Sequence, residues 1–264
     1  KPTPGKIEVV PTKPLADQHD LSLAYSPGVA AASLLISKDP SEASNLTSRA
    51  NLVGVISNGS AVLGLGNIGA LAAKPVMEGK AGLFKTFAGI NVFDIEIDES
   101  DPEKFIEIVT ALEPTFGGIN LEDIKAPECF MIEAALKDRM KIPVMHDDQH
   151  GTAIIVAAAI INGLKIVGKN IGDIKLVCSG AGSAALACLD LLIKLGLNKN
   201  NVFVCDIAGV IYEGRTEETN DYNIKYAQDT DARELGEVIG GSDVFIGLSA
   251  PGVLQPDMVK GMAL

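Results

Sequence analysis

The segment Lys175-Leu-Val-Cys-Ser-Gly-Ala-Gly-Ser-Ala-Ala185 shows how this chain is built. An apolar run typical of a buried strand leads into a glycine-rich loop, and an apolar helical stretch follows to about Leu195. Strand-like and helix-like stretches alternate in the same way along the rest of the chain. This alternation predicts an α/β fold with a parallel, doubly wound sheet.

Strands are expected at 51–57, 61–63 and 91–97, with a hairpin-type turn at Asn58-Gly59. An extended arm is expected over the first twenty residues, and helices are expected after the Ser-Pro-Gly turn and from Gly151 through Leu164.

Composition restricts the class of protein. Of the 264 residues 47% are hydrophobic, which is ample for a core and too many for a disordered chain. The formal net charge of −12 argues against a nucleic-acid partner, whose phosphates attract a basic surface. The longest apolar run, 153–161, has about half the length of a membrane span. We expect neither nucleic acid nor membrane as a partner.

The cysteines indicate the compartment. Cys129, Cys178, Cys188 and Cys205 lie in apolar surroundings and show no C-x-x-C spacing. Buried, reduced thiols of this kind are usual in a reducing compartment. The N-terminal residues 1–5 contain no apolar signal-peptide core. A cytoplasmic location is therefore expected.

Two glycine-rich loops compete for a dinucleotide, because each would present backbone N–H groups at a helix N-terminus. The later loop consists of Gly180, Gly182, Ser183, Ala184 and Ala185. It follows a clear strand and precedes a second strand that ends at Asp206, where an acid binds the ribose hydroxyls. We favour this loop for the cofactor and interpret the earlier one, 64–69, as a packing turn.

Two pairs of adjacent acids, Glu122-Asp123 and Asp147-Asp148, each follow a strand-like run. Carboxylate oxygens are the ligands that Mg²⁺ and Mn²⁺ prefer. Two such pairs converging on one point would repel each other unless a cation or a lysine lay between them. The pattern predicts a divalent-metal site, with an N-cap of the following helix as the alternative role for Asp148.

Other residue types near these acids allow several assignments. His146 and His150 are spaced as in zinc proteases, but no glutamate follows His146, and both are expected at a loop-to-helix junction. Lys80, in a segment of small residues, is a candidate acid or base, with Lys74 and Lys85 as local alternatives. Tyr25 precedes a Ser-Pro-Gly turn and is expected to pack on the core or to serve a site.

Four motifs, in order along nearly the whole chain, resemble those of short bacterial-type malic enzymes. They are 23–30 around Tyr25, 64–70 with Gly79-Lys80, Asn120-Leu-Glu-Asp123, and 146–152. The resemblance implies an N-terminal catalytic domain, residues 1–150, followed by a Rossmann-like NAD(P)-binding domain, residues 151–264. It further implies oxidative decarboxylation of L-malate to pyruvate and CO₂ with NAD or NADP and Mg²⁺ or Mn²⁺, in a homodimer.

The resemblance also assigns roles. Tyr25 resembles the general acid that protonates the enolate, Lys80 the base at the malate C2 hydroxyl, and Asp147 the carboxylate partner of that lysine. The resemblance assigns metal ligation to Glu122, Asp123 and Asp148, and it assigns dinucleotide binding to the loop at Gly180.

The chain departs from the family pattern in three places. Ala61-Val-Leu63 stands where larger relatives carry an arginine for the malate carboxylate, which leaves the residue that grips this group unassigned. The family continues past Leu264, so we expect these residues to be C-terminally incomplete. No cation follows Asp206 to meet a 2′-phosphate, which favours NAD mildly and leaves the cofactor undecided.

Two alternatives remain at this point. A metal-independent amino-acid dehydrogenase would share the lysine and the dinucleotide domain, but it would leave both acid pairs without a task. A non-catalytic ligand-binding relative of the same fold is the other.

Overall fold

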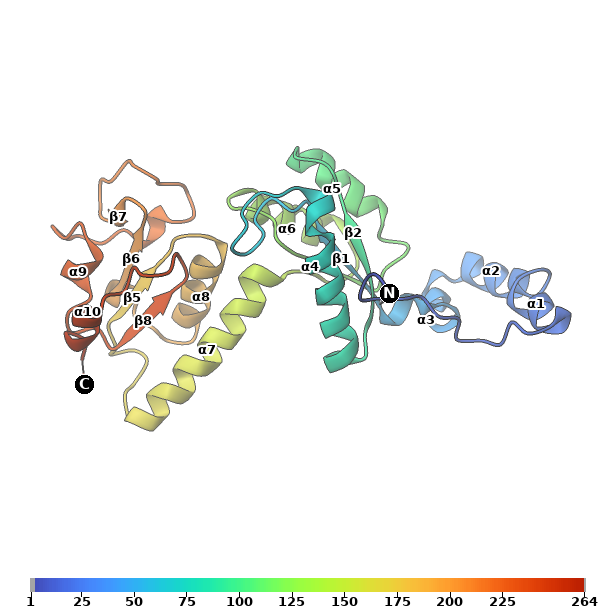
Figure 1. Ribbon diagram of the computed structural model, residues 1–264, viewed down its shortest axis with the longest axis horizontal. Helices are drawn as coiled ribbons and strands as arrows, with labels where there is room; N and C mark the ends of the chain where they lie inside the picture. Colours follow the sequence, from blue (N-terminus) through green and yellow to red (C-terminus); the bar gives the residue numbers. More distant parts are fainter. Residues whose placement is uncertain (1–2, 264) are drawn as a thin grey trace. The chain divides into compact units, whose positions relative to one another are not determined.

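The computed structural model describes residues 3–263, which fold into two compact units (Figure 1). Unit 1 comprises Lys1–Ile124 and Met131–Met145, and unit 2 comprises Lys125–Phe130 and His146–Leu264. Each unit is built around a four-stranded sheet with helices between the strands. The predicted α/β class is confirmed.

The sheet of unit 1 has the order β2-β1-β3-β4. Its strands are β1 (Leu52–Ser57), β2 (Asn91–Glu96), β3 (Gly118–Leu121) and β4 (Val144–His146), and its main helices are α4 (Ala70–Leu83), α5 (Pro102–Ala111) and α6 (Glu128–Arg139). Strand β1 pairs in parallel with both β2 and β3. The carboxyl ends of these three strands therefore lie along one edge, where α/β proteins place their ligands.

The N-terminal segment of unit 1 consists of short helices. They are α1 (Gln18–Ala24), α2 (Val29–Lys38), η1 (Pro40–Glu42), α3 (Ala43–Leu46) and η2 (Ser48–Asn51), and none contains a buried residue. The helix expected after the Ser-Pro-Gly turn is confirmed as α2. The extended arm expected over the first twenty residues ends earlier, because Asp17 caps α1 through its side chain. Residues 1–2 of that arm lie outside the described part.

The connection after β1 differs from the sequence prediction. A hairpin-type turn at Asn58-Gly59 and a new strand at 61–63 were expected, whereas Val62 makes only an isolated bridge to Gly66. Gly59 has φ +64°, and a Cβ there would lie 2.3 Å from the carbonyl oxygen of Gly69. The turn therefore packs against the start of α4 and leaves no room for a strand.

The sheet of unit 2 has the order β7-β6-β5-β8. Its strands are β5 (Leu176–Ser179), β6 (Val202–Asp206), β7 (Gly209–Val210) and β8 (Val244–Gly247), and its helices are α7 (Asp147–Val167), α8 (Ser183–Lys194), η4 (Lys199–Asn201), η5 (Ile224–Tyr226), α9 (Leu235–Val238) and α10 (Pro256–Lys260). Strands β6 and β8 run parallel to β5, whereas β7 is antiparallel to β6. The expected parallel sheet is confirmed for β5, β6 and β8. The two-residue strand β7 adds an antiparallel edge, since a two-residue connection after β6 can only reverse the chain.

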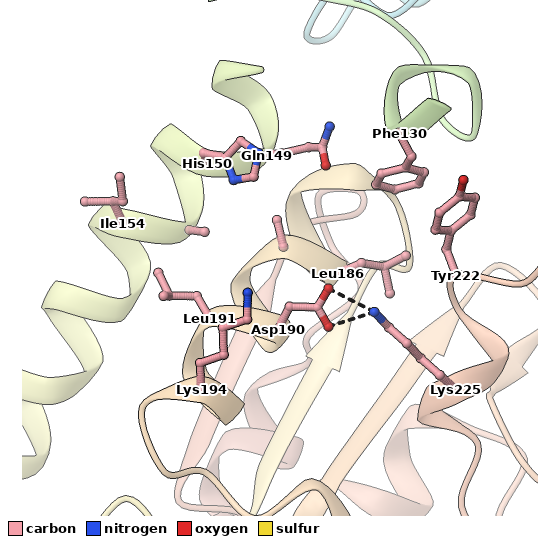
Figure 2. Close-up of a pocket in the computed structure, with 12 residues that line it drawn as sticks. Phe130, Gln149, His150, Ile154, Leu186, Asp190, Leu191, Lys194, Tyr222 and Lys225 are labelled. Carbon is pink, nitrogen blue, oxygen red and sulfur yellow. Dashed lines mark hydrogen bonds and ion pairs between the residues drawn. The ribbon is translucent and has the colours of Figure 1, made fainter. Parts of the chain in front are cut away.

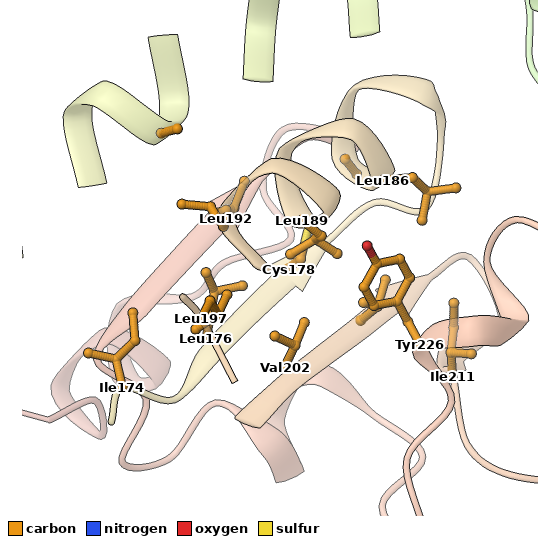
Figure 3. Packing of buried hydrophobic residues seen from close by; sticks show 14 of the residues in the cluster. Ile174, Leu176, Cys178, Leu186, Leu189, Leu192, Leu197, Val202, Ile211 and Tyr226 are labelled. Atoms are coloured by element: carbon orange, nitrogen blue, oxygen red, sulfur yellow. The ribbon is translucent and has the colours of Figure 1, made fainter. Parts of the chain in front are cut away.

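The core of unit 2 fills the space between its helices and the sheet (Figure 3). Leu189 and Leu192 of α8 pack with Leu176 of β5, and all three are fully buried. The Tyr226 ring closes the same cluster, and its hydroxyl donates a short hydrogen bond to Asp190. Burial raises the pKa of Tyr226, so this hydroxyl stays protonated.

Helix α7 is longer than predicted, because it begins at Asp147 and not near Gly151. By length and composition alone it could cross a membrane, and a single helix of this kind is weak evidence for a span. Its Ala157 and Leu164 are buried in the core of unit 2. The helix therefore contributes directly to the packing of this unit.

All four cysteines are buried, and none of them forms a disulfide within residues 3–263. Burial raises the pKa of Cys178 and of Cys205 to about 12. These thiols are therefore protonated and unreactive at neutral pH, as the sequence predicted.

Candidate active site

The first acid pair lies at the carboxyl end of β3, a strand whose four residues are all buried. Glu122 and Asp123 are only 5% and 4% exposed. The backbone of Asp123 has φ +54°, a left-handed conformation that is uncommon for a residue with a Cβ. Its carbonyl oxygen accepts a hydrogen bond of 3.0 Å from the amide of Ala61. Local strain of this kind is typical of functional positions.

Two side chains hold the carboxylate of Glu122. Lys80, near the C-terminal end of α4, places Nζ 3.0 Å from Oε1. Asn120 donates from Nδ2 to Oε2 over 2.9 Å. Residues two apart on a strand face the same side, which is why Asn120 reaches Glu122. The sequence analysis gave Asn120 no role, although this alternation could have identified it.

The structure distinguishes the three candidate lysines. Lys74 pairs with Asp94 at 2.6 Å and with Glu96 at 3.4 Å, and the hydrogen bond to Asp94 is the main cause of its raised pKa. Lys85 donates to Asn91 over 2.8 Å and is exposed. Of the three, Lys80 is the one that pairs with an acid of the predicted site, and its side chain is only 20% exposed.

The second acid pair lies in the first turn of α7. The N-cap of this helix is His146, so the alternative role of Asp148 as N-cap is wrong. Both carboxylates are favoured there by the positive end of the helix dipole. His146 is fully buried, with Nε2 3.5 Å from Oδ2 of Asp148. His146 and His150 therefore straddle the start of α7, as expected of a pair at a helix junction.

Tyr25 does not pack on the core. It is the C-cap residue of α1, and its side chain is 75% exposed. The expectation of a core tyrosine is wrong because neither α1 nor α2 buries any residue. In the monomer, therefore, Tyr25 stands on an exposed helical segment.

The later glycine loop joins β5 to α8. Gly180 has φ +123°, and a Cβ there would lie 2.5 Å from the carbonyl oxygen of Leu248. Gly182 is the N-cap of α8 without a side-chain capping bond, and a Cβ there would meet nothing within 4 Å. Ser183, Ala184 and Ala185 follow as the first turn of α8. The helix thus presents uncapped backbone N–H groups at an open position, as an anion-binding terminus should.

The earlier loop has a different local environment. Gly64, Gly66 and Gly69 all have positive φ. The amides of Ile68 and Gly69 donate to the carbonyl oxygen of Gly59, and Gly69 precedes α4 as its N-cap residue. These contacts tie the loop to the turn after β1, which is how a packing turn behaves.

Asp206, the last residue of β6, forms a short ion pair with Arg215. Its Oδ1 accepts a hydrogen bond of 2.8 Å from the amide of Ala208. No cation follows Asp206 directly in the sequence, and Arg215, which lies further along the chain, is the cation that the fold brings to it. Arg215 was missed because the reversal of the chain into β7 brings it back to the end of β6.

Unit 2 also contains a cavity of about 460 Å³ between α7, α8 and the segment around Tyr222 (Figure 2). The rings of Phe130 and Tyr222 stack with centroids 4.3 Å apart at one end. Lys225, on the same segment as Tyr222, pairs with Asp190 of α8 at 2.8 Å. None of the predicted site residues lines this cavity.

Comparison with known families identifies the chain. Residues 4–137 match the malic enzyme N-terminal domain, and residues 149–264 match the malic enzyme NAD-binding domain. The chain belongs to the malic enzyme family. Matches over both domains count against the alternative of an amino-acid dehydrogenase.

Curated members of the malic enzyme family are similar over nearly the whole chain. The NADP-dependent malic enzyme of Escherichia coli K12 is 66% identical over 99% of this chain and 35% of the relative. The NAD-dependent malic enzyme of Rhizobium meliloti is 62% identical over 99% of this chain and 34% of the relative. The chain thus spans about a third of the length of these malic enzymes.

Solved malic enzyme structures have the same fold. The NAD-dependent malic enzyme of Thermotoga maritima matches 98% of this chain and 70% of that chain, with a TM-score of 0.92 and 45% identity. The malic enzyme of Pyrococcus horikoshii matches 99% of this chain and 63% of that chain, with a TM-score of 0.92 and 44% identity.

Proposed function

We propose that the protein oxidatively decarboxylates L-malate to pyruvate and CO₂ with reduction of NAD or NADP, in the presence of Mg²⁺ or Mn²⁺. The observation that carries the proposal is the pairing of Lys80 with Glu122 beside buried Asp123, in a chain of the malic enzyme family. Curated relatives that are 66% and 62% identical are named NADP- and NAD-dependent malic enzymes, respectively.

Lys80 is proposed as the base that takes the proton from the C2 hydroxyl of malate. Its mostly buried ammonium lies against Glu122, and this pairing keeps the amine within a water-poor site, where it can be tuned for proton transfer. Asp147 is proposed as a second carboxylate partner of Lys80. Tyr25 is proposed as the acid that delivers a proton to C3 after loss of CO₂.

Glu122, Asp123 and Asp148 are proposed as the metal ligands. The donor set fits a hard divalent cation, because all three groups are carboxylates, and two of them are buried where a bare negative charge is costly. When bound, the ion polarises the C2 oxygen of the substrate and stabilises negative charge that develops there. Asn120 orients one of these carboxylates through its bond to Oε2 of Glu122.

The loop from Gly180 to Ala185 is proposed to hold the pyrophosphate of the dinucleotide, with Asp206 at its adenosine ribose. Gly182 fits this role, since the space around it would admit a phosphate close to the backbone. When bound, the nicotinamide accepts the hydride from C2 of malate.

We propose a homodimer, in which a second copy of the chain covers the N-terminal helices. These helices leave Leu21, Leu23, Leu34 and Leu35 exposed, together with Tyr25. A proton donor for a reactive enolate must be shielded from bulk water, which Tyr25 is not on its own chain. The partner copy would provide that cover, and Tyr25 would serve the site of the partner. A cytoplasmic location is proposed from the buried, reduced cysteines.

The direct test follows reduced-nicotinamide absorbance with the full-length protein, L-malate, Mn²⁺ and either NAD or NADP. We expect absorbance to rise with pyruvate as product and to stop when a chelator is added. If folded protein gave no rise in absorbance with either cofactor, the proposal would be refuted.

A further inference from the structure

We infer that the cavity of unit 2 binds a small carboxylate with an apolar body, and that this ligand stabilises the first turn of α7. The cavity is separate from both glycine loops and from both acid pairs, since none of their residues lines it. Its volume of about 460 Å³ lies in the range usual for small-molecule pockets. The effect on α7 concerns Asp148, a proposed metal ligand, so this part of the inference rests on the proposed function.

Apolar and aromatic side chains form much of the cavity wall (Figure 2). Ala153 and Ile154 contribute from α7, and Leu186 contributes from α8. The rings of Phe130 and Tyr222 stack on each other at one end, so an occupant packs beside them and not between them. Such a wall favours a ligand with an apolar body, because their contact removes apolar surface from water on both sides.

The lysines and the aspartate of the lining leave one positive charge in surplus. Lys225 pairs with Asp190 at 2.8 Å, and the hydroxyl of Tyr226 also donates to Asp190, so these two charges compensate each other. The ammonium group of Lys194, which also lines the cavity, forms no ion pair or hydrogen bond with residues 3–263. In a chain with a formal net charge of −12, this local surplus indicates a ligand with a single negative charge.

Gln149 independently indicates an acceptor oxygen on the ligand. It lines the cavity and is only 5% exposed, and its Nε2 has no hydrogen-bond partner among the described residues. A buried donor without a partner costs free energy, which a ligand oxygen would recover. The terminal torsion of a glutamine is soft, so the amide can turn toward such an oxygen. A carboxylate serves both as the acceptor for Gln149 and as the counter-ion for Lys194.

The position of Gln149 connects the cavity to the proposed metal site. Gln149 directly follows Asp148 in the first turn of α7, so a ligand bonded to Gln149 holds the turn that carries Asp148. A ligand that favours one conformation of this turn raises the affinity for a metal bound in the same conformation. The metal raises the affinity for the ligand by the same factor, and we expect this factor to be about fivefold.

The binding test titrates the full-length protein with para-fluorobenzoate and follows the probe by fluorine NMR. The wild type is expected to bind it with a Kd of about 1 mM, which is usual for so small a ligand. Neutral para-fluorobenzamide and succinate should each bind at least about tenfold more weakly, because the first lacks the charge and the second lacks the apolar body. L-malate should not displace the probe, because none of the proposed catalytic residues lines the cavity.

Four variants locate the bound probe. Gln149→Leu should weaken probe binding about tenfold, through loss of one hydrogen bond to a charged group. Lys194→Met should weaken it about threefold, since solvent screens an exposed charge. Ala187→Leu adds bulk to the cavity wall and should prevent binding. Lys165→Met, which removes an exposed lysine of α7 outside the cavity, is the matched control and should bind the probe as the wild type does.

The site would be overturned if the wild type did not bind the probe, or if Gln149→Leu and Lys194→Met bound it as tightly as the wild type. Tighter binding of phenyl phosphate would assign a phosphate and overturn the carboxylate.

The effect on α7 is tested by a Mn²⁺ titration with and without saturating probe, in which electron paramagnetic resonance measures the free ion. The probe should tighten Mn²⁺ binding about fivefold in the wild type and leave it unchanged in Ala187→Leu. Equal Mn²⁺ affinity with and without probe in the wild type would overturn the effect. Neither titration requires turnover. Protein that binds the probe but neither binds Mn²⁺ nor oxidises malate would therefore refute the proposed function and leave the cavity site intact.

Discussion

The two units use the same edge of a parallel sheet in opposite ways. At the carboxyl end of β3, unit 1 gathers charged side chains, with Glu122 held by Lys80 and Asn120. At the carboxyl end of β5, unit 2 carries a glycine loop that presents backbone N–H groups and little side chain. One architecture thus suits the proton and metal chemistry proposed for the first unit and the recognition of a phosphate-bearing cofactor proposed for the second.

The ion pairs at these edges, Lys80–Glu122 and Arg215–Asp206, differ in the same way as the two units do. A buried charge is tolerated only when it is paired and hydrogen-bonded. Arg215 pairs with Asp206 and also donates hydrogen bonds to two backbone carbonyl oxygens, so this ion pair is held in one arrangement. Lys80, which is proposed to exchange a proton, is held by a side chain that is itself proposed to bind a metal. The Arg215–Asp206 pair is a structural support, whereas the Lys80–Glu122 pair is proposed to take part in the reaction.

Substitution of Lys80 tests the proposed reactive role of the Lys80–Glu122 pair, and its effect is expected to be the largest. Lys80→Ala should lower kcat about 10³-fold, because the site loses its proposed base. Lys85→Ala removes an exposed lysine that bonds Asn91, and it should leave turnover near the wild-type rate. Steady-state malate oxidation measures both. Near-normal turnover by Lys80→Ala would mean that the charged edge of unit 1 is structural.

Tyr25→Phe should lower kcat about 10²-fold through loss of the proposed proton donor. If the exposed N-terminal helices act on a second copy, mixing Tyr25→Phe with Lys80→Ala protein should restore activity, since each mixed dimer would contain one site with both native side chains. Activity is measured after subunit exchange, with each variant alone as the control. Failure to recover, despite exchange shown by mass, would place Tyr25 in the site of its own chain.

Asn120→Ala tests the support of the proposed metal ligand. Loss of its bond to Glu122 should raise the Mn²⁺ concentration for half-maximal activity about 10-fold, within the range usual for partners of metal ligands. Asn162→Ala, which removes only a bond to a helix carbonyl, should not change it. The readout is a Mn²⁺ titration of chelator-treated protein. Equal Mn²⁺ requirements in the two variants would count against Glu122 as a ligand.

The two glycines of the later loop should respond differently to alanine. Gly180→Ala should lower the free energy of unfolding by about 1–3 kcal/mol, because a Cβ there is strained by φ +123° and meets Leu248. Gly182→Ala should change stability little, yet raise KM for the dinucleotide, since its Cβ would occupy the space left for the pyrophosphate. Urea unfolding and nucleotide titration separate the effects, and equal responses would remove the distinction.

Much of the fold was predictable because local patterns and packing agree. The strand-like runs at 51–57 and 175–178 correspond to β1 and β5, since the residues of a strand buried on both faces must be apolar. The run at 91–97 corresponds to β2, an edge strand that is only partly buried. The predicted strand at 61–63 is wrong because an apolar run of three residues does not by itself fix a strand, and the close approach of Gly59 to Gly69 leaves this segment in a turn.

The sequence predicted those parts of the site that depend on which residue types lie at the ends of strands and helices. Sequence alone determined that acids follow two strands, that a glycine loop opens α8, and that Asp206 ends the next strand. Tertiary structure decided which lysine faces Glu122, that Tyr25 is exposed, and that Arg215 returns to Asp206. The reason is physical: local propensity and periodicity act over a few residues, whereas ion pairing and burial depend on which distant segments the fold brings together.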